Sequence, residues 1–236
     1  MTDSILVNIQ KSSKKGEKLL AILLDPDKTK LDEISIISKR IENIKANFIF
    51  VGGSFVKKGV TGIFVEKLKE HTNIPIVLFP GDYSQVTNNA DGLLFLSLLS
   101  GRNPEYLIEQ QIKAVPFLKD SNLEIIPTGY ILIDGGINSS VLKVSKTTAI
   151  SQNNIQLAVE TAVAGMYKGK QLIYLEAGSG AKTVVNEKLI SEVKKNISIP
   201  LIVGGGIKTK EQLNSAYNNG ADLVVIGTAF ENNIDL

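Results

Sequence analysis

One glutamate, Glu176, combines with a glycine-rich segment in a pattern that could do chemistry. It ends an apolar segment and is followed by Gly178, Ser179 and Gly180. Free backbone N–H groups at such a turn, together with the dipole of a following helix, favour a phosphate. A carboxylate beside that phosphate is placed to take a proton from the bound ligand. The alternative is that Glu176 pairs with a lysine of the interior and that the glycines only make a turn.

Two more carboxylates, Asp25 and Asp27, follow the first apolar segment of the chain. Carboxylates two residues apart on a turn suit Mg²⁺, which takes oxygen ligands and usually keeps waters and substrate phosphates. Their other interpretation is that they cap a helix beginning near Thr29. The next apolar segment ends in residues 51–54 (VGGS), which either lets a ligand approach the backbone or is a plain tight turn.

Two further small-residue segments lie near the end of the chain. One is residues 204–206 (GGG), and the other, after one further apolar segment, is Gly227 and Thr228. In parallel barrels that bind phosphate, such loops follow the last two strands and expose backbone amides. Two such loops in this order predict a phosphorylated ligand.

The composition excludes several classes of protein. The 236 residues contain no Cys and one His, His71, which argues against disulfides, thiolate zinc sites and cysteine- or histidine-based catalysis. The net charge of +2 gives no marked excess of basic residues for binding nucleic acid, so we expect no nucleic-acid partner. No basic stretch with a long apolar core stands at the beginning, and no apolar segment is long enough to span a bilayer, so we expect a cytoplasmic protein.

Short apolar segments alternate with polar segments of helical spacing along the whole chain. The apolar segments lack polar alternation, as is typical of parallel strands covered on both faces. The predicted strands are residues 19–24, 48–51, 74–79, 92–96, 124–126 (or 124–133), 172–175, 201–203 and 223–226. This pattern and length predict an α/β fold, a (β/α)8 TIM barrel with phosphate-binding loops after strands 7 and 8. An open doubly wound sheet is the alternative.

No linker divides the chain, so we expect a single domain over residues 1–236. One irregular stretch, residues 134–148, is either an extended active-site loop or a surface excursion, and the sequence favours neither.

The motifs at the strand ends, taken in order, resemble the geranylgeranylglyceryl phosphate synthase family, which includes bacterial heptaprenylglyceryl phosphate synthases. The resemblance extends along essentially the whole chain, and the most specific of its motifs are LLDPDK at residues 23–28 and YLEAGSGA at residues 174–181. Its anchors also include VGGS at residues 51–54, LFPGDYSQV at 78–86, GGGI at 204–207 and GTAFE at 227–231.

The resemblance implies a role for each matching residue. Asp25 and Ser54 resemble the family's Mg²⁺ ligands, and Glu176 resembles the base that deprotonates the attacking hydroxyl. Residues that resemble the family's binding segments for sn-glycerol 1-phosphate are Tyr174, Leu175, Glu176, Ala177, Gly178, Ser179, Gly180, Gly205, Gly206, Gly227 and Thr228.

The resemblance also implies an ether-forming prenyltransferase that uses Mg²⁺, sn-glycerol 1-phosphate and a polyprenyl diphosphate. We expect a C20 geranylgeranyl donor rather than a C35 heptaprenyl donor, although the chain has no Trp to serve as a length limiter. A homo-oligomer, either a dimer or a hexamer, and peripheral contact with a membrane are further expectations. The rival interpretations are another phosphate-binding barrel enzyme and a non-catalytic binder of phosphorylated ligands.

Overall fold

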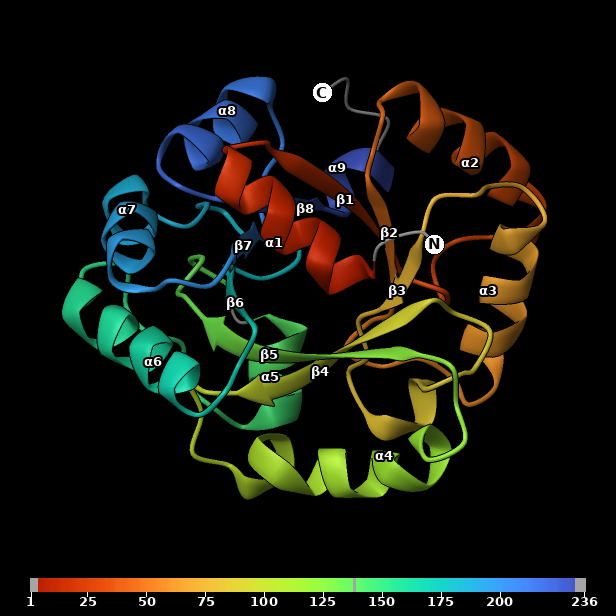
Figure 1. Cartoon of the computed structure of the whole chain (residues 1–236), viewed down its shortest axis with the longest axis horizontal. Coiled ribbons are helices and arrows are strands. Elements are labelled where there is room, and N and C mark those ends of the chain that lie inside the picture. The colour runs from red at the N-terminus through yellow and green to blue at the C-terminus, as the bar shows by residue number, and fades with distance from the viewer. Residues whose placement is uncertain (1–3, 138, 232–236) are drawn as a thin grey trace.

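The computed structural model describes residues 4–137 and 139–231, which form a closed barrel of parallel strands surrounded by helices (Figure 1). The strands pair in chain order, and β8 returns to pair with β1. They are β1 (Leu19–Leu24), β2 (Phe48–Val51), β3 (Ile76–Leu78), β4 (Gly92–Leu98), β5 (Glu124–Leu132), β6 (Leu172–Glu176), β7 (Leu201–Gly204) and β8 (Leu223–Ile226). The predicted TIM barrel is confirmed, and the open sheet is excluded.

Most of the helices follow a strand and cover the outside of the barrel (Figure 1). The α-helices are α1 (Ile5–Lys15), α2 (Ile34–Asn43), α3 (Val60–Lys69), α4 (Gln110–Leu118), α5 (Ser140–Ser145), α6 (Ile155–Tyr167), α7 (Glu187–Asn196), α8 (Lys210–Asn218) and α9 (Thr228–Glu231). Shorter helical segments are the 3₁₀ turns η1 (Leu31–Glu33) and η2 (Tyr83–Gln85) and the π-helical η3 (Glu105–Glu109). None of the helices in the described part of the chain is long and apolar enough to cross a membrane.

Alternation along each strand separates two apolar cores. On β6, Tyr174 belongs to the core inside the barrel, whereas Ile173 and Leu175 pack with the surrounding helices. Both sets are buried because a parallel strand in a barrel is covered on its two faces. This is why the strands were visible in the sequence as continuous apolar segments.

Helix α1 lies across the end of the barrel that faces the viewer in Figure 1 and closes it. Its Ile5 and Ile9 join the core inside the barrel. The N–H groups of Ile5 and Leu6 donate to the carboxylate of Glu124 at the start of β5, at 2.6 and 2.8 Å. The carboxylate satisfies amides that a helix start otherwise leaves unpaired. The opposite end of the barrel, where the strands finish, is left for the cavity described below.

Asp222 ties the closed end of the barrel together. Its side chain is buried and accepts from the Leu201 N–H at 2.7 Å, the Lys194 ammonium at 2.6 Å and the Ser13 hydroxyl at 2.8 Å. These donors come from β7, α7 and α1, so one carboxylate joins three elements.

We predict that Asp222→Asn lowers the free energy of unfolding by about 2 kcal/mol, because it weakens charge-assisted bonds and leaves a half-buried ammonium without its partner. Urea denaturation followed by circular dichroism measures this. Asp120→Asn, at an exposed position after α4, is the matched control and should change stability by less than about 0.5 kcal/mol. Equal midpoints for the two variants would contradict the role given to Asp222.

Candidate active site

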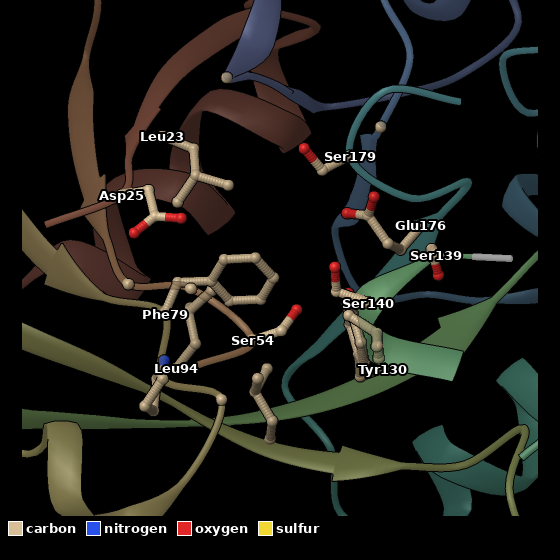
Figure 2. A pocket seen from close by; sticks show the side chains of 18 of the residues that line it. Leu23, Asp25, Ser54, Phe79, Leu94, Tyr130, Ser139, Ser140, Glu176 and Ser179 are labelled. Carbon is tan, nitrogen blue, oxygen red and sulfur yellow. The ribbon is translucent and has the colours of Figure 1, made fainter. Parts of the chain in front are cut away.

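A cavity of about 580 Å³ opens at the carboxyl ends of the strands. Residues from the ends of all the strands, and from the loops that follow them, line it. Figure 2 shows Asp25 and Glu176 on opposite sides of this cavity, with the Phe79 ring between them. In TIM barrels the active site lies at this end, so the cavity is the candidate site.

Glu176 is the last residue of β6, one residue beyond the predicted strand, and its side chain is only 6% exposed. Its Oε1 accepts a hydrogen bond from the Gly178 N–H at 2.7 Å. Burial raises the pKa of Glu176 to about 7, and the neighbouring Tyr174 hydroxyl and the Gly178 amide partly offset that rise. The carboxyl group therefore exchanges its proton near neutral pH, which suits a general base.

The predicted alternative for Glu176, pairing with a lysine, is wrong for the described residues, where no lysine lies within ion-pair distance of it. Backbone surrounds the carboxylate instead. A Cβ atom on Gly205 would stand 2.3 Å from Glu176 Oε1 and 2.5 Å from the Gly178 nitrogen. Glycine at position 205 therefore makes room for the buried carboxylate.

The loops after β6, β7 and β8 meet beside Glu176. Gly205 and Gly206 have φ angles of 80° and 76°, a left-handed backbone that glycine adopts without strain. The Ser179 and Thr228 hydroxyls lie 3.1 Å apart and connect the first and last of these loops. The N–H groups of Gly205 and Gly206 donate to no group in the described ranges. Small residues with available amides at this place suit a phosphate group.

Asp25 begins a turn after β1, and its side chain is 14% exposed. Its carboxylate pairs with the Lys28 ammonium at 2.7 Å and accepts from the Asp27 N–H at 3.1 Å. The suggested helix near Thr29 is absent, because the first helical turn begins at Leu31. The cap interpretation of this carboxylate pair is therefore wrong, and the Asp25 side chain lines the cavity.

Asp27 has a different place from Asp25. Its Oδ2 accepts from the Lys57 N–H at 3.2 Å, and Asp27 is not among the residues that line the cavity. Ser54, after β2, does line it (Figure 2). Gly53 stands between these segments, and a Cβ atom there would lie 3.1 Å from Asp25 Oδ2. Their spacing alone does not distinguish the two acids; the family resemblance names only Asp25, and only Asp25 lines the cavity.

Most of the predicted binding residues line the cavity. They are Asp25, Ser54, Tyr174, Glu176, Ser179, Gly180, Gly205, Gly206, Gly227 and Thr228. Leu175 and Ala177 point instead into the core between barrel and helices, and Gly178 lies behind Glu176 with its N–H committed to it. Any contact of Leu175, Ala177 or Gly178 with a ligand has to come from the backbone.

The sequence did not decide whether the stretch 134–148 belongs to the site. The irregular stretch 134–148, of which residue 138 lies outside the described residues, contains the short helix α5. Ser139 caps this helix by accepting from the Leu142 N–H, and Ser140 faces the cavity near Glu176 (Figure 2). The stretch is therefore a wall of the site rather than a surface excursion. Ser139 and Ser140, residue types that favour helix starts, were the signal that could have found α5.

Comparison with known proteins agrees with this geometry. A model of the PcrB family matches residues 13–236. Geranylgeranylglyceryl phosphate synthase of Zunongwangia profunda is 56% identical over 228 residues, covering 97% of this chain and 97% of that protein. The enzyme of the same name from Flavobacterium johnsoniae is 53% identical over 224 residues, covering 95% and 92%.

A solved structure is similar over almost the whole chain. It is the crystal structure of (S)-3-O-geranylgeranylglyceryl phosphate synthase from Thermoplasma acidophilum in complex with its substrate sn-glycerol-1-phosphate. The two chains superpose with a TM-score of 0.93 at 32% identity, covering 99% of this chain and 94% of that one. The chain therefore belongs to the PcrB family of geranylgeranylglyceryl phosphate synthases and is a prenyltransferase of ether-lipid biosynthesis.

Proposed function

We propose that this enzyme joins the primary hydroxyl of sn-glycerol 1-phosphate to C1 of geranylgeranyl diphosphate, forming an ether and releasing diphosphate. The observation that carries the proposal is the position of Glu176. Its buried carboxyl group has a pKa of about 7 and lies beside two glycine loops suited to a phosphate. A base near a phosphate site matches an acceptor that carries both a phosphate and a hydroxyl group.

The acceptor's phosphate is assigned to the loops after β7 and β8. The N–H groups of Gly205 and Gly206 and the Thr228 hydroxyl supply donors there, and the absence of side chains at the glycines lets a phosphate approach. The similar Thermoplasma acidophilum enzyme binds sn-glycerol-1-phosphate, which supports this acceptor. Fixing the phosphate holds the hydroxyl at a set distance from Glu176, so positioning contributes to the rate.

Proton transfer is assigned to Glu176. The ionised carboxylate accepts the proton of the hydroxyl as its oxygen attacks C1 of the prenyl donor. Because burial disfavours the charged form, the carboxylate gains a proton readily at this position. The Gly178 N–H keeps one carboxylate oxygen in place, at 2.7 Å.

The donor's diphosphate is assigned to the side of the cavity where Asp25 and Ser54 lie. No cluster of three or more His, Cys, Asp or Glu side chains suited to a metal occurs in the described ranges. One carboxylate and one hydroxyl nevertheless fit Mg²⁺, which commonly takes one or two carboxylates and fills its shell with substrate phosphates and water. Mg²⁺ bound there would neutralise the charge that grows on the departing diphosphate. Asp25 would exchange its contact with Lys28 for the ion.

The prenyl chain is assigned to the apolar wall that continues from this point. The lining residues on that wall belong to β4 and α4 and include Leu94, Phe95, Leu96, Leu98 and Ala114. Apolar walls exclude water and solvate an isoprenoid chain. A C20 chain is the donor that the named relatives' product implies.

Three sequence-based expectations remain predictions of this proposal. They are a single domain over residues 1–236, a homo-oligomer (dimer or hexamer), and work in the cytoplasm with peripheral membrane contact.

We predict that Glu176→Gln lowers turnover by about 10²- to 10⁴-fold, because the amide cannot accept the proton. The KM for sn-glycerol 1-phosphate should change little, since the amide leaves the phosphate loops intact. In the wild-type enzyme turnover should rise with pH through about 7 and then level off, because only the ionised carboxylate is a base. Steady-state kinetics between pH 5.5 and 9 measure both effects.

Glu33→Gln, at an exposed position in η1, is the matched control and should keep wild-type turnover and pH dependence. Wild-type turnover in Glu176→Gln, or a rising limb that survives in it, would remove the base role.

We predict that Asp25→Asn raises the Mg²⁺ concentration needed for half-maximal turnover by about 10-fold or more, because a carboxylate ligand becomes a neutral amide. Asp27→Asn is the matched control: it makes the same change two residues away, at a side chain outside the cavity. Its Mg²⁺ dependence should resemble that of the wild type. Identical Mg²⁺ titrations for both variants and the wild type would show that Asp25 does not hold the ion.

A further inference from the structure

Phe79 occupies the middle of the cavity. It follows β3 directly, and its N–H donates to the Val51 carbonyl at 2.8 Å. The ring is partly exposed to the cavity, and Figure 2 shows it between Asp25 on one side and Glu176 on the other. Reaction requires C1 of the prenyl donor to lie between the diphosphate side and the base side. A donor bound between Asp25 and Glu176 would therefore bring C1 toward the Phe79 ring.

The ring is held in place by two tyrosines. Phe79 stacks on Tyr174, with ring centroids 5.3 Å apart and planes inclined by 15°. Tyr130 packs edge-to-face with both rings, its centroid 5.7 Å from that of Phe79 and 5.3 Å from that of Tyr174, with interplanar angles of 74° and 88°. Stacked and edge-to-face arrangements are the favoured ones for aromatic rings. Three mutually packed rings leave Phe79 little freedom to rotate.

The backbone of Phe79 is equally constrained. A Cβ atom on Gly52 would lie 2.0 Å from the Phe79 carbonyl oxygen, so the two loops pack backbone against backbone. Ring and backbone are thus fixed before any substrate binds. A group that needs no rearrangement at the moment of reaction is suited to stabilising a charge that appears only in the transition state.

Positive charge develops on the donor during prenyl transfer. The C1–oxygen bond of the donor breaks, its electron pair leaves with the diphosphate, and the allylic carbons carry the positive charge. The hydroxyl oxygen of the acceptor then forms the ether bond to C1, and its proton passes to Glu176. The side chains between Asp25 and Glu176 carry no charge in Figure 2: Leu23 and Leu94 are apolar, and Ser54 and Ser140 are neutral hydroxyls.

We infer that the face of the Phe79 ring stabilises the allylic cation by a cation–π interaction, so that Phe79 is a further catalytic residue of the reaction. The inference rests on the proposed function. An aromatic face attracts a cation within about 6 Å of its centroid, most strongly where water is excluded. Tyr174 stacks on Phe79, and the Phe50 ring lies 6.3 Å from it at an interplanar angle of 47°. The Phe79 ring remains partly exposed where it lines the cavity, and a substrate can reach it there.

Progressive fluorination of the ring tests this inference. Fluorine removes electron density from the ring face while changing its shape little, so packing and cation binding are separated. We propose to replace Phe79 with 4-fluoro-, 3,5-difluoro- and 3,4,5-trifluorophenylalanine. The single-turnover rate of ether formation would be measured with geranylgeranyl diphosphate, sn-glycerol 1-phosphate and Mg²⁺. Single turnover avoids any limit set by release of the product.

We expect the logarithm of the rate to fall steadily with each added fluorine, reaching a loss of about 10-fold or more in the trifluoro form. The KM for sn-glycerol 1-phosphate and the melting temperature should stay close to those of the wild type. The same substitutions at Phe64, which is fully buried on α3 away from the cavity, are the matched control and should leave the rate unchanged.

A rate independent of fluorination, combined with a large loss in Phe79→Leu, would show that the ring only fills space and would overturn the inference. Failure of the wild-type protein to form any ether would instead contradict the proposed function. The two failures are therefore distinguishable in one series of assays.

Discussion

Closure of the parallel barrel is the constraint on which the rest of the structure depends. Hydrogen bonding between β8 and β1, with Ile22 opposite Ile226, brings the two ends of the chain together. Because every strand runs in the same direction, closure places all the carboxyl ends around one opening. Asp25, Ser54, Glu176 and Thr228 are far apart in the sequence, yet they line one cavity for this reason. Helix α1 closes the other end of the barrel. The core inside the barrel therefore forms the floor of the cavity.

That floor and the glycine loops give Glu176 its chemistry. Aromatic rings below it and backbone around it keep out water, and this burial raises the pKa of its carboxyl group to about 7. The same glycines that make room for the carboxylate expose the amides suited to a phosphate. One set of small residues thus serves both proton transfer and acceptor binding, so a side chain at Gly205 would disturb both.

The strands were predictable because a parallel barrel strand is apolar on both faces. β1, β2 and β8 have the predicted bounds, and the motifs at their ends identified the family. The errors lie at strand ends, and β3 is shorter at both ends than the predicted 74–79. The predicted β6 stops at Leu175, before the charged Glu176, whereas in the structure Glu176 is the last residue of the strand and faces inward. β4 continues past Ser97 to Leu98 because its partner Tyr130 extends the pairing. Neither effect is visible in one segment alone.

The site was harder to predict where side-chain direction decides it. The spacing of Asp25 and Asp27 does not tell them apart, although the family resemblance names only Asp25; in the structure only Asp25 lines the cavity. Phe79 and α5 escaped assignment because their place depends on contacts between loops that are distant in the chain.

The central claim is that this cavity forms an ether between a glycerol phosphate and a prenyl diphosphate. The most direct measurement is mass spectrometry of the lipid products after incubation with Mg²⁺, sn-glycerol 1-phosphate and an equimolar mixture of C15, C20 and C35 prenyl diphosphates. The account predicts one dominant product, the C20 ether of glycerol phosphate. A dominant C35 ether would contradict the assigned donor, and the absence of any ether while glycerol phosphate still binds would contradict the function itself.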